Sequence, residues 1–153
     1  MSSSDIIEIR PVAVVKRESA NENERDPTIV SKIVFSEEMT DGLTGIEDFS
    51  HIHVIFWMHQ VNDSDKTLIH PGGPSDEPVG IFATRAPIHP NPIGQTVVEV
   101  VKRDKNTLWV RGLDAIDDTP VLDIKPYPDW GDGRFKIVQD FRVPNWLREL
   151  IEE

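Results

Sequence analysis

The segment HIHVIFWMHQ, residues 51–60, is the most apolar stretch of this 153-residue chain. In a strand, successive side chains point to opposite faces of the sheet. The two faces here carry Ile52, Val54, Phe56 and Met58 on one side, and His53, Ile55, Trp57 and His59 on the other. Because both faces are mostly apolar, the segment predicts a central strand that is covered on both sides.

Short β-prone segments continue on both sides of this strand. Because they are rich in β-branched residues, we predict further strands over residues 6–16, 28–35, 79–85, 95–102, 107–113, 121–127 and 135–140. Residues 36–50 predict one short helical turn capped by Ser36, and only residues 143–153 have the spacing of an amphipathic helix. The order favours a mainly β fold, an antiparallel β-barrel of about seven or eight strands with a C-terminal helix.

The composition is that of a globular protein. We expect residues 1–153 to form a single domain with no additional C-terminal domain, because this length suffices for one core. The chain has no cysteine, which excludes disulfides and thiolate metal sites and favours a reducing, cytoplasmic compartment. We expect neither secretion nor a membrane span, because residues 1–10 lack a signal pattern and every apolar run is short.

The charge is unevenly distributed. The formal net charge is −11, and residues 1–78 hold 15 acidic and 6 basic residues, whereas residues 79–127 hold 6 of each. Phosphate contacts depend on Lys and Arg. The balance therefore excludes an extensive nucleic-acid surface but leaves a local basic surface around residues 85–125.

The segment GIFATRAPIHPNPIG, residues 80–94, places three prolines between two predicted strands. Each proline fixes φ and removes a backbone donor, and a stiff loop loses little entropy when it binds a ligand. Arg85 can bind a carboxylate, and Asn91 can bind the edge of a nucleobase. A structural loop, with Arg85 in an internal ion pair, fits the same residues equally well.

The segment DAIDDTPVLDIKPY, residues 114–127, holds four aspartates, a lysine and a tyrosine. Asp and Thr in a tight turn usually bond to their own backbone. Asp123 and Lys125 lie two residues apart, so on a strand they share a face. They predict either a structural ion pair or an acid/base site.

A metal site is a separate alternative, because His51 and His53 also share a strand face. No third ligand at a fixed spacing accompanies them. The simpler interpretation packs His53 against a neighbouring layer and places His51 at the start of the strand.

Together, GIFATRAPIHPNPIG and GLDAIDDTPVLDIKPY resemble the signature segments of the TsaA-like family, whose members include a tRNA N6-threonylcarbamoyladenosine methyltransferase. The upstream block IEDFSHIHVIFWMHQ is also similar, and the resemblance spans residues 6–127. It implies a β-barrel, S-adenosyl-L-methionine as the methyl donor, a homodimer, and a modified adenosine beside the tRNA anticodon as the acceptor.

The resemblance also implies a cofactor-binding set, which comprises His59, Gln60, Arg85, Gln95, Ala115, Ile116, Asp117, Asp118 and Thr119. For catalysis, we expect Asn91 to hold the acceptor amine and Asp123 or Tyr127 to take up its proton. His89 and Lys125 are the expected substrate contacts, although Lys125 can instead neutralise Asp123.

Two departures from the family pattern concern these residues. His89 stands where the family often has arginine, and Asp118 replaces a glycine that would tolerate a positive φ. Two other functions remain open. One is a regulator that binds S-adenosyl-L-methionine without methylating tRNA, which the acidic balance and the lack of a further domain favour. The other is a metal-dependent enzyme built around His51 and His53.

Overall fold

A computed structural model describes residues 5–18, 25–62, 65–74, 76–128 and 138–152. The chain forms two compact units. The first unit comprises Met1–His59 and Ile93–Trp130, and the second comprises Gln60–Pro92 and Gly131–Glu153.

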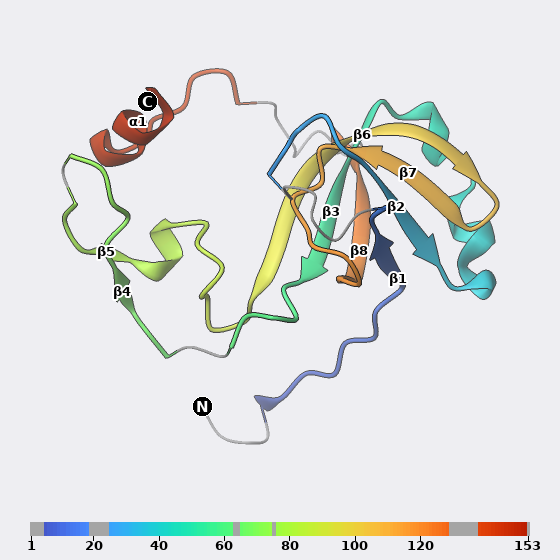
Figure 1. The fold of residues 1–153 in the computed structure, drawn as a ribbon, viewed down its shortest axis with the longest axis horizontal. Coiled ribbons are helices and arrows are strands. Elements are labelled where there is room, and N and C mark those ends of the chain that lie inside the picture. Colours follow the sequence, from blue (N-terminus) through green and yellow to red (C-terminus); the bar gives the residue numbers. More distant parts are fainter. Residues whose placement is uncertain (1–4, 19–24, 63–64, 75, 129–137, 153) are drawn as a thin grey trace. The chain divides into compact units, whose positions relative to one another are not determined.

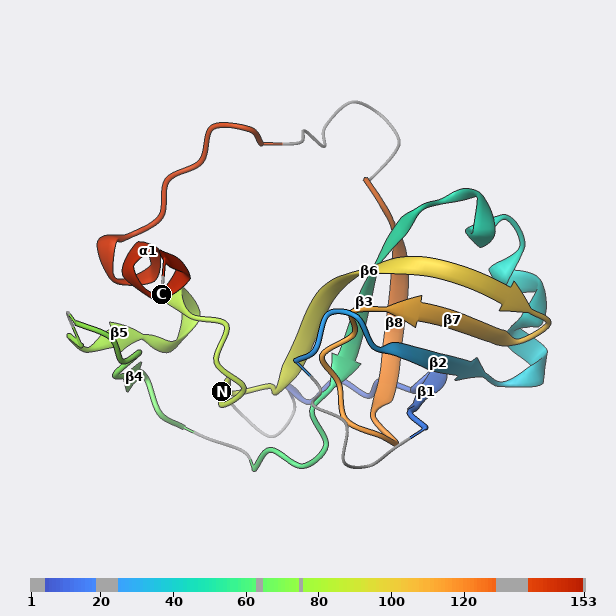
Figure 2. The ribbon, with the colours of Figure 1, turned by 45° about the horizontal axis from the view of Figure 1, so that its top comes forward.

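The first unit is a closed antiparallel barrel of six strands in the order β1-β2-β7-β6-β3-β8. Its strands are β1 (Ala13–Lys16), β2 (Val30–Phe35), β3 (His51–Trp57), β6 (Ile93–Asp104), β7 (Thr107–Arg111) and β8 (Pro120–Tyr127). Figures 1 and 2 show these strands wrapping around one interior. The barrel, with the two short strands of the second unit and one C-terminal helix, confirms the predicted mainly β fold.

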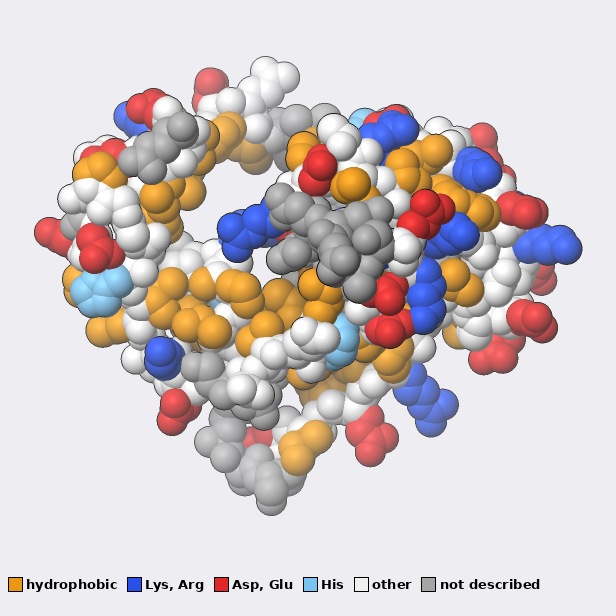
Figure 3. All heavy atoms as spheres, in the orientation of Figure 1, with side chains coloured by type: hydrophobic (Ala, Val, Ile, Leu, Met, Phe, Trp, Pro, Cys, Tyr) orange, Lys and Arg blue, Asp and Glu red, His pale blue; other side chains and the backbone are white. Residues whose placement is uncertain are grey.

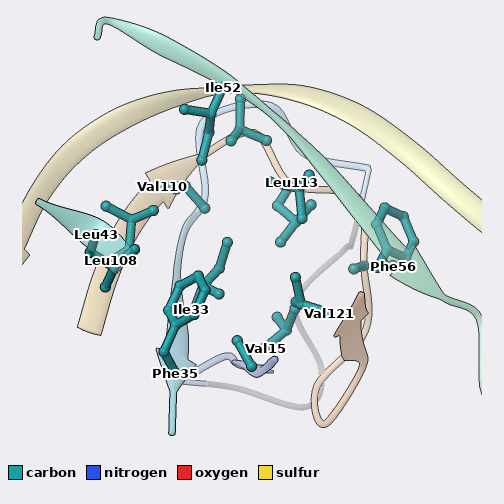
Figure 4. Packing of buried hydrophobic residues seen from close by; sticks show 14 residues of the cluster. Val15, Ile33, Phe35, Leu43, Ile52, Phe56, Leu108, Val110, Leu113 and Val121 are labelled. Carbon is teal, nitrogen blue, oxygen red and sulfur yellow. The ribbon is translucent and has the colours of Figure 1, made fainter. Parts of the chain in front are cut away.

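Strand β3 is the central strand that its composition predicts, because it pairs with β6 on one side and β8 on the other. Its alternate residues Ile52, Val54 and Phe56 are buried in the barrel. They meet inward-facing residues of the other strands, including Val15, Ile33, Leu108, Val110 and Val121. Figure 4 shows these side chains converging from the surrounding strands. Burial of this alternating set is the main source of the unit's stability.

Two 3₁₀ helices, η2 (Glu37–Leu43) and η3 (Ile46–Asp48), connect β2 to β3. Leu43 from η2 is 2% exposed and belongs to the core. Ser36 precedes η2, as predicted, but its side chain makes no capping hydrogen bond. Arg103 donates from Nε to a Glu47 carboxylate oxygen at 2.7 Å, so β6 is tied to η3.

The packing around Gly94 explains why the proline-rich segment ends in glycine. Gly94 lies opposite Phe56 in the β3–β6 ladder, and a Cβ atom built on Gly94 would fall 2.3 Å from the Phe56 ring. The ring therefore occupies the space that any side chain at this position would need. The close approach joins the first residues of β6 to the core.

Three strand predictions need correction. β1 begins only at Ala13, because Pro11 cannot donate to a ladder, and Ile6, Ile7 and Ile9 before it are exposed. The strand predicted over residues 79–85 is limited to β5 (Val79–Gly80), because Ile81–Ala83 turn into the 3₁₀ helix η4. Of residues 135–140, those at 138–140 are not extended into a strand, and the others lie outside the described residues.

The second unit holds β4 (Leu68–Ile69), which pairs with β5, together with η4 and helix α1 (Asn145–Glu152). The predicted C-terminal helix is thus confirmed. A Cβ atom on Gly73 would lie 3.1 Å from Leu150 Cδ2, so α1 packs directly on the turn at Gly73. Among the described residues, no helix combines the length and apolar character needed to span a bilayer.

We predict that Gly94→Ala lowers the free energy of unfolding by about 1–3 kcal/mol, because the new methyl group displaces the Phe56 ring. Gly42→Ala is the matched control, since no atom lies within 4 Å of a Cβ built there. Urea unfolding of both variants measures the difference. Equal midpoints for the two variants would contradict the packing that the structure shows.

Candidate functional site

The residues around Thr84 fix the shape of the proline loop, which we define as residues 84–92. The Thr84 hydroxyl donates to the Ile81 carbonyl at 2.8 Å and accepts from the Ala86 amide at 3.3 Å. The Thr84 carbonyl is 3.0 Å from His89 Nε2. Thr84 therefore bonds to Ile81 before the loop and to Ala86 and His89 within it. This role was not predicted from the sequence.

His89 is the residue that departs from the expected arginine. Its Nε2 atom donates to the Thr84 carbonyl, and its ring meets the Phe82 ring edge-on with centroids 5.9 Å apart. In this structure, His89 therefore stabilises the loop. Phe82 is 81% exposed, which is unusual for a phenylalanine and makes it a candidate ligand contact that no local sequence signal indicated.

Arg85 and Asn91 lie in the proline loop, and both are exposed. The next residue, Pro92, is buried, so the loop is anchored immediately after Asn91. The loop thus carries one guanidinium and one amide on an internally bonded backbone. This is the arrangement that the rigid, ligand-binding interpretation requires.

The turn of residues 115–119 precedes β8 and is held from β1. Asp117 accepts a hydrogen bond from the Arg17 amide at 2.8 Å. Arg17 Nη1 donates to the carbonyls of Leu113 at 3.2 Å and Ala115 at 3.0 Å. Arg17 was not predicted from the sequence, because its partners are about a hundred residues away along the chain.

Within this turn, several groups are already engaged. Ala115 and Thr119 are 3% and 1% exposed. The Thr119 hydroxyl donates to the Ile116 carbonyl at 2.7 Å, and the Asp118 amide donates to the Val15 carbonyl at 2.9 Å. The side chains of Ala115 and Thr119 thus stabilise the turn, whereas Asp118 is exposed and Ile116 and Asp117 are half-buried.

Asp118 has φ of +65°, the left-handed conformation in which glycine is at ease. Asp118, which replaces the glycine of the family pattern, therefore keeps a conformation that suits glycine. Aspartate is among the few other residues that enter this region readily. Its carboxylate accepts a hydrogen bond from Lys16 Nζ, which also raises the pKa of Lys16.

The outer face of strands β6, β3 and β8 brings four more predicted residues together. Ile55 of β3 lies between Gln95 and Asp123. In the same way, His53 lies between Val97 and Lys125, and His51 lies between Glu99 and Tyr127. The four predicted residues on this face are Gln95, Asp123, Lys125 and Tyr127.

Asp123 and Lys125 form an ion pair, one of the two interpretations that their shared strand face left open. Lys125 Nζ lies 3.0 Å from Asp123 Oδ2, and both side chains are more than half exposed. A second Asp123 oxygen accepts a hydrogen bond from the Ile124 amide at 2.9 Å. The carboxylate is accessible, although it is engaged on two sides.

The two histidines of β3 pack against an aromatic ring. The ring centroids of His53 and Tyr127 are 5.4 Å apart, and those of His51 and Tyr127 are 6.5 Å apart. His51 Nδ1 lies 2.8 Å from the Ser50 hydroxyl. The described part of the chain holds no group of three His, Cys, Asp or Glu residues placed to bind a metal ion.

The predicted site residues divide between the units. Gln60, Arg85, His89 and Asn91 belong to the second unit, and the remaining ones, with His59 as the last residue before the boundary, belong to the first. The second unit also contains an open hollow lined by Asp65, Lys66, Thr67, Leu68, Ile69, His70 and Ile88. None of the predicted residues lines this hollow.

Residues 15–133 match the model of the tRNA-methyltransferase O N-terminal domain. The chain belongs to this family. It is 42% identical over 124 residues to an S-adenosyl-L-methionine-binding protein of Archaeoglobus fulgidus, a match that covers 78% of this chain and 88% of that protein. It is 41% identical over 126 residues to a probable S-adenosyl-L-methionine-binding protein of Methanothermobacter thermautotrophicus, covering 79% and 90% of the two chains.

The fold agrees with this assignment. The crystal structure of TrmO from Pseudomonas aeruginosa superposes with a TM-score of 0.68 at 28% sequence identity, covering 92% of this chain. The match covers 62% of the TrmO chain, so this chain spans about three fifths of that structure. The family resemblance identified in the two sequence segments is thereby confirmed.

We predict that Asp118→Val lowers the free energy of unfolding by about 1–3 kcal/mol relative to Asp118→Gly, because a β-branched residue is strained at a positive φ. Both variants lose the Lys16 partner equally, so the comparison isolates the backbone. Chemical denaturation measures it. If the two variants unfold at the same denaturant concentration, the left-handed conformation at residue 118 is wrong.

Proposed function

We propose that this chain binds S-adenosyl-L-methionine and transfers a methyl group to N6 of a threonylcarbamoylated adenosine beside the anticodon of a tRNA. The observation that carries the proposal is the proline loop. Its backbone is fixed by Thr84, and it carries Arg85 and Asn91 exposed. Family membership over residues 15–133 supports the same chemistry.

The donors and surfaces of the described residues fit the proposed cofactor. The exposed Arg85 guanidinium can bind the carboxylate of S-adenosyl-L-methionine. The exposed Phe82 ring can stack on the face of the cofactor's adenine. In the 115–119 turn, the contacts proposed for the cofactor fall to the exposed Asp118 and the half-buried Ile116 and Asp117, while Ala115 and Thr119 shape the turn from the interior. His59, Gln60 and Gln95 are exposed and complete the proposed cofactor-binding set.

When bound, S-adenosyl-L-methionine supplies an electrophilic methyl group, so the protein needs no nucleophile of its own. The tasks left to the chain are to orient the acceptor amine and to accept its proton. We assign the first to the Asn91 side-chain carbonyl. We assign the second to the Asp123 carboxylate or the Tyr127 hydroxyl, both of which lie on the outer face of β8.

Substrate contacts are proposed for His89 and Lys125. His89 already bonds to the Thr84 carbonyl, so its contribution is to hold the loop in shape beside the substrate. Lys125 neutralises Asp123 at 3.0 Å and remains exposed enough to meet a phosphate. A protein with these tasks works where tRNA is found, and we place it in the cytoplasm.

We also propose a homodimer, as the family resemblance implies. The outer face of β6, β3 and β8 is the surface that supports it. Ile93 and Val97 on this face are 41% and 43% exposed, and the half-buried Ile55 and Trp57 lie beside them.

Sedimentation equilibrium of the wild-type protein and Val97→Asp tests the proposal, because the variant should sediment as a monomer.

The experiment for methyl transfer uses labelled S-adenosyl-L-methionine with tRNA that carries the threonylcarbamoyl group and with the same tRNA that lacks it. We expect label in the first tRNA only.

Arg85→Ala should weaken cofactor affinity by about 10- to 100-fold, the effect of losing a charged hydrogen bond. Arg148→Ala, an exposed position on α1, should leave it unchanged. Asn91→Ala should lower kcat more than cofactor affinity.

A second function is favoured by a separate observation. The relatives from Archaeoglobus fulgidus and Methanothermobacter thermautotrophicus are named for S-adenosyl-L-methionine binding, and the chain carries a net charge of −11. Both facts suit a protein that binds the cofactor without methylating tRNA. Cofactor binding by calorimetry with no label in either tRNA would establish this function instead.

A further inference from the structure

Three lysines and a tryptophan form a row across the outside of the barrel. In the strand register, Lys16 of β1 lies opposite Lys32 of β2, and Lys32 lies opposite Trp109 of β7. Trp109 in turn lies opposite Lys102 of β6. Adjacent strands are about 4.8 Å apart, so the row places four side chains side by side on neighbouring strands. We call it the lysine row.

Trp109 fixes the two lysines that flank it. Lys102 Nζ lies 4.4 Å from the Trp109 ring centroid, and Lys32 Nζ lies 5.8 Å from it. Both distances are within the range of cation–π attraction. The indole therefore restricts both ammonium groups, which reduces the side-chain entropy that each would lose on binding an anion.

The lysines of this row differ in their carboxylate partners. Lys16 binds Asp118, whereas no ion pair to Lys32 or Lys102 occurs among the described residues. Lys32 and Lys102 therefore bring two positive charges to either side of Trp109 that no carboxylate of the described residues neutralises by an ion pair. The two lysines are thus a local positive charge on a chain whose net charge is −11. Figure 3 shows Lys and Arg side chains lying among hydrophobic and acidic ones on the barrel side of the molecule.

We propose that the lysine row binds the phosphate backbone of RNA. The row presents repeated single charges in a line, and a nucleic-acid backbone presents repeated phosphates in a line. Lysine acts on phosphate as a mobile point charge and needs no fixed geometry. The inference rests on the proposed function for the choice of tRNA as the ligand.

The row also ends at the proposed cofactor-binding turn. Lys16, its last member, contacts Asp118, and Asp118 lies in the 115–119 turn. RNA bound along the row would therefore run toward that turn. The lysine row is thus a short basic surface on an acidic chain. It agrees with the distribution of charge along the sequence, which left room only for a local basic surface.

The test measures tRNA affinity over a range of salt concentrations for the wild-type protein, Lys32→Gln, Lys102→Gln and the double variant. We expect each single change to raise the Kd about three- to tenfold and to lower the slope of log K against log salt by about 1. Unlike Lys102→Gln, Lys102→Arg should bind tRNA with the wild-type affinity, because arginine keeps the charge and stacks on tryptophan.

Lys105→Gln is the matched control. It removes the same charge from the turn of the same β6–β7 hairpin, outside the row, and should leave tRNA binding unchanged. Calorimetry with S-adenosyl-L-methionine should give the same affinity for all variants, which separates this inference from the proposed function. Loss of methyl transfer in a protein that still binds tRNA through the row would overturn only the proposed function.

Two results would overturn the inference itself. One is tRNA binding that is equally weakened by Lys105→Gln, or unaffected by the changes at Lys32 and Lys102. The other is a wild-type protein that binds no tRNA, in which case the row serves an acidic protein partner or only packs Trp109.

Discussion

The packing of the Phe56 ring over Gly94 is the constraint on which the rest of the structure depends. It joins β3, the central strand, to the first residues of β6. The proline loop ends at the same place, where Pro92 is buried. The contact therefore fixes the pairing of β3 with β6 at the point where the barrel strand β6 begins. The conformation of the proline loop itself depends on the hydrogen bonds of Thr84.

The two signature segments have different structural roles. The proline loop is held by its own hydrogen bonds, through the Thr84 hydroxyl and carbonyl, and it carries Arg85 and Asn91 exposed. The 115–119 turn is instead held from β1, through Arg17 and the Val15 carbonyl. Its exposed residue Asp118 accepts a left-handed backbone and binds Lys16. Through that ion pair, the turn is continuous with the lysine row on the outside of the barrel.

Much of the fold follows from local sequence pattern. Residues 51–57 form a central strand because both faces are apolar, and the β6–β7 hairpin forms where two β-branched segments flank a polar turn. Local pattern failed where a long-range or capping contact decides the structure. Ile81 and Phe82 are residue types that favour strands, yet Ile81–Ala83 form a 3₁₀ helix. The Thr84 hydroxyl ends this helix by donating a hydrogen bond to the Ile81 carbonyl. Arg17 and the lysine row depend on strand pairing across the barrel, which no local window contains.

The central claim is that the proline loop is part of the site that binds S-adenosyl-L-methionine. Amide hydrogen exchange with and without the cofactor tests it most directly. The account predicts added protection at residues 81–92 and 115–119, with the amides of the β1–β2 ladder unchanged. Cofactor binding that leaves exchange at residues 81–92 unaltered would contradict it.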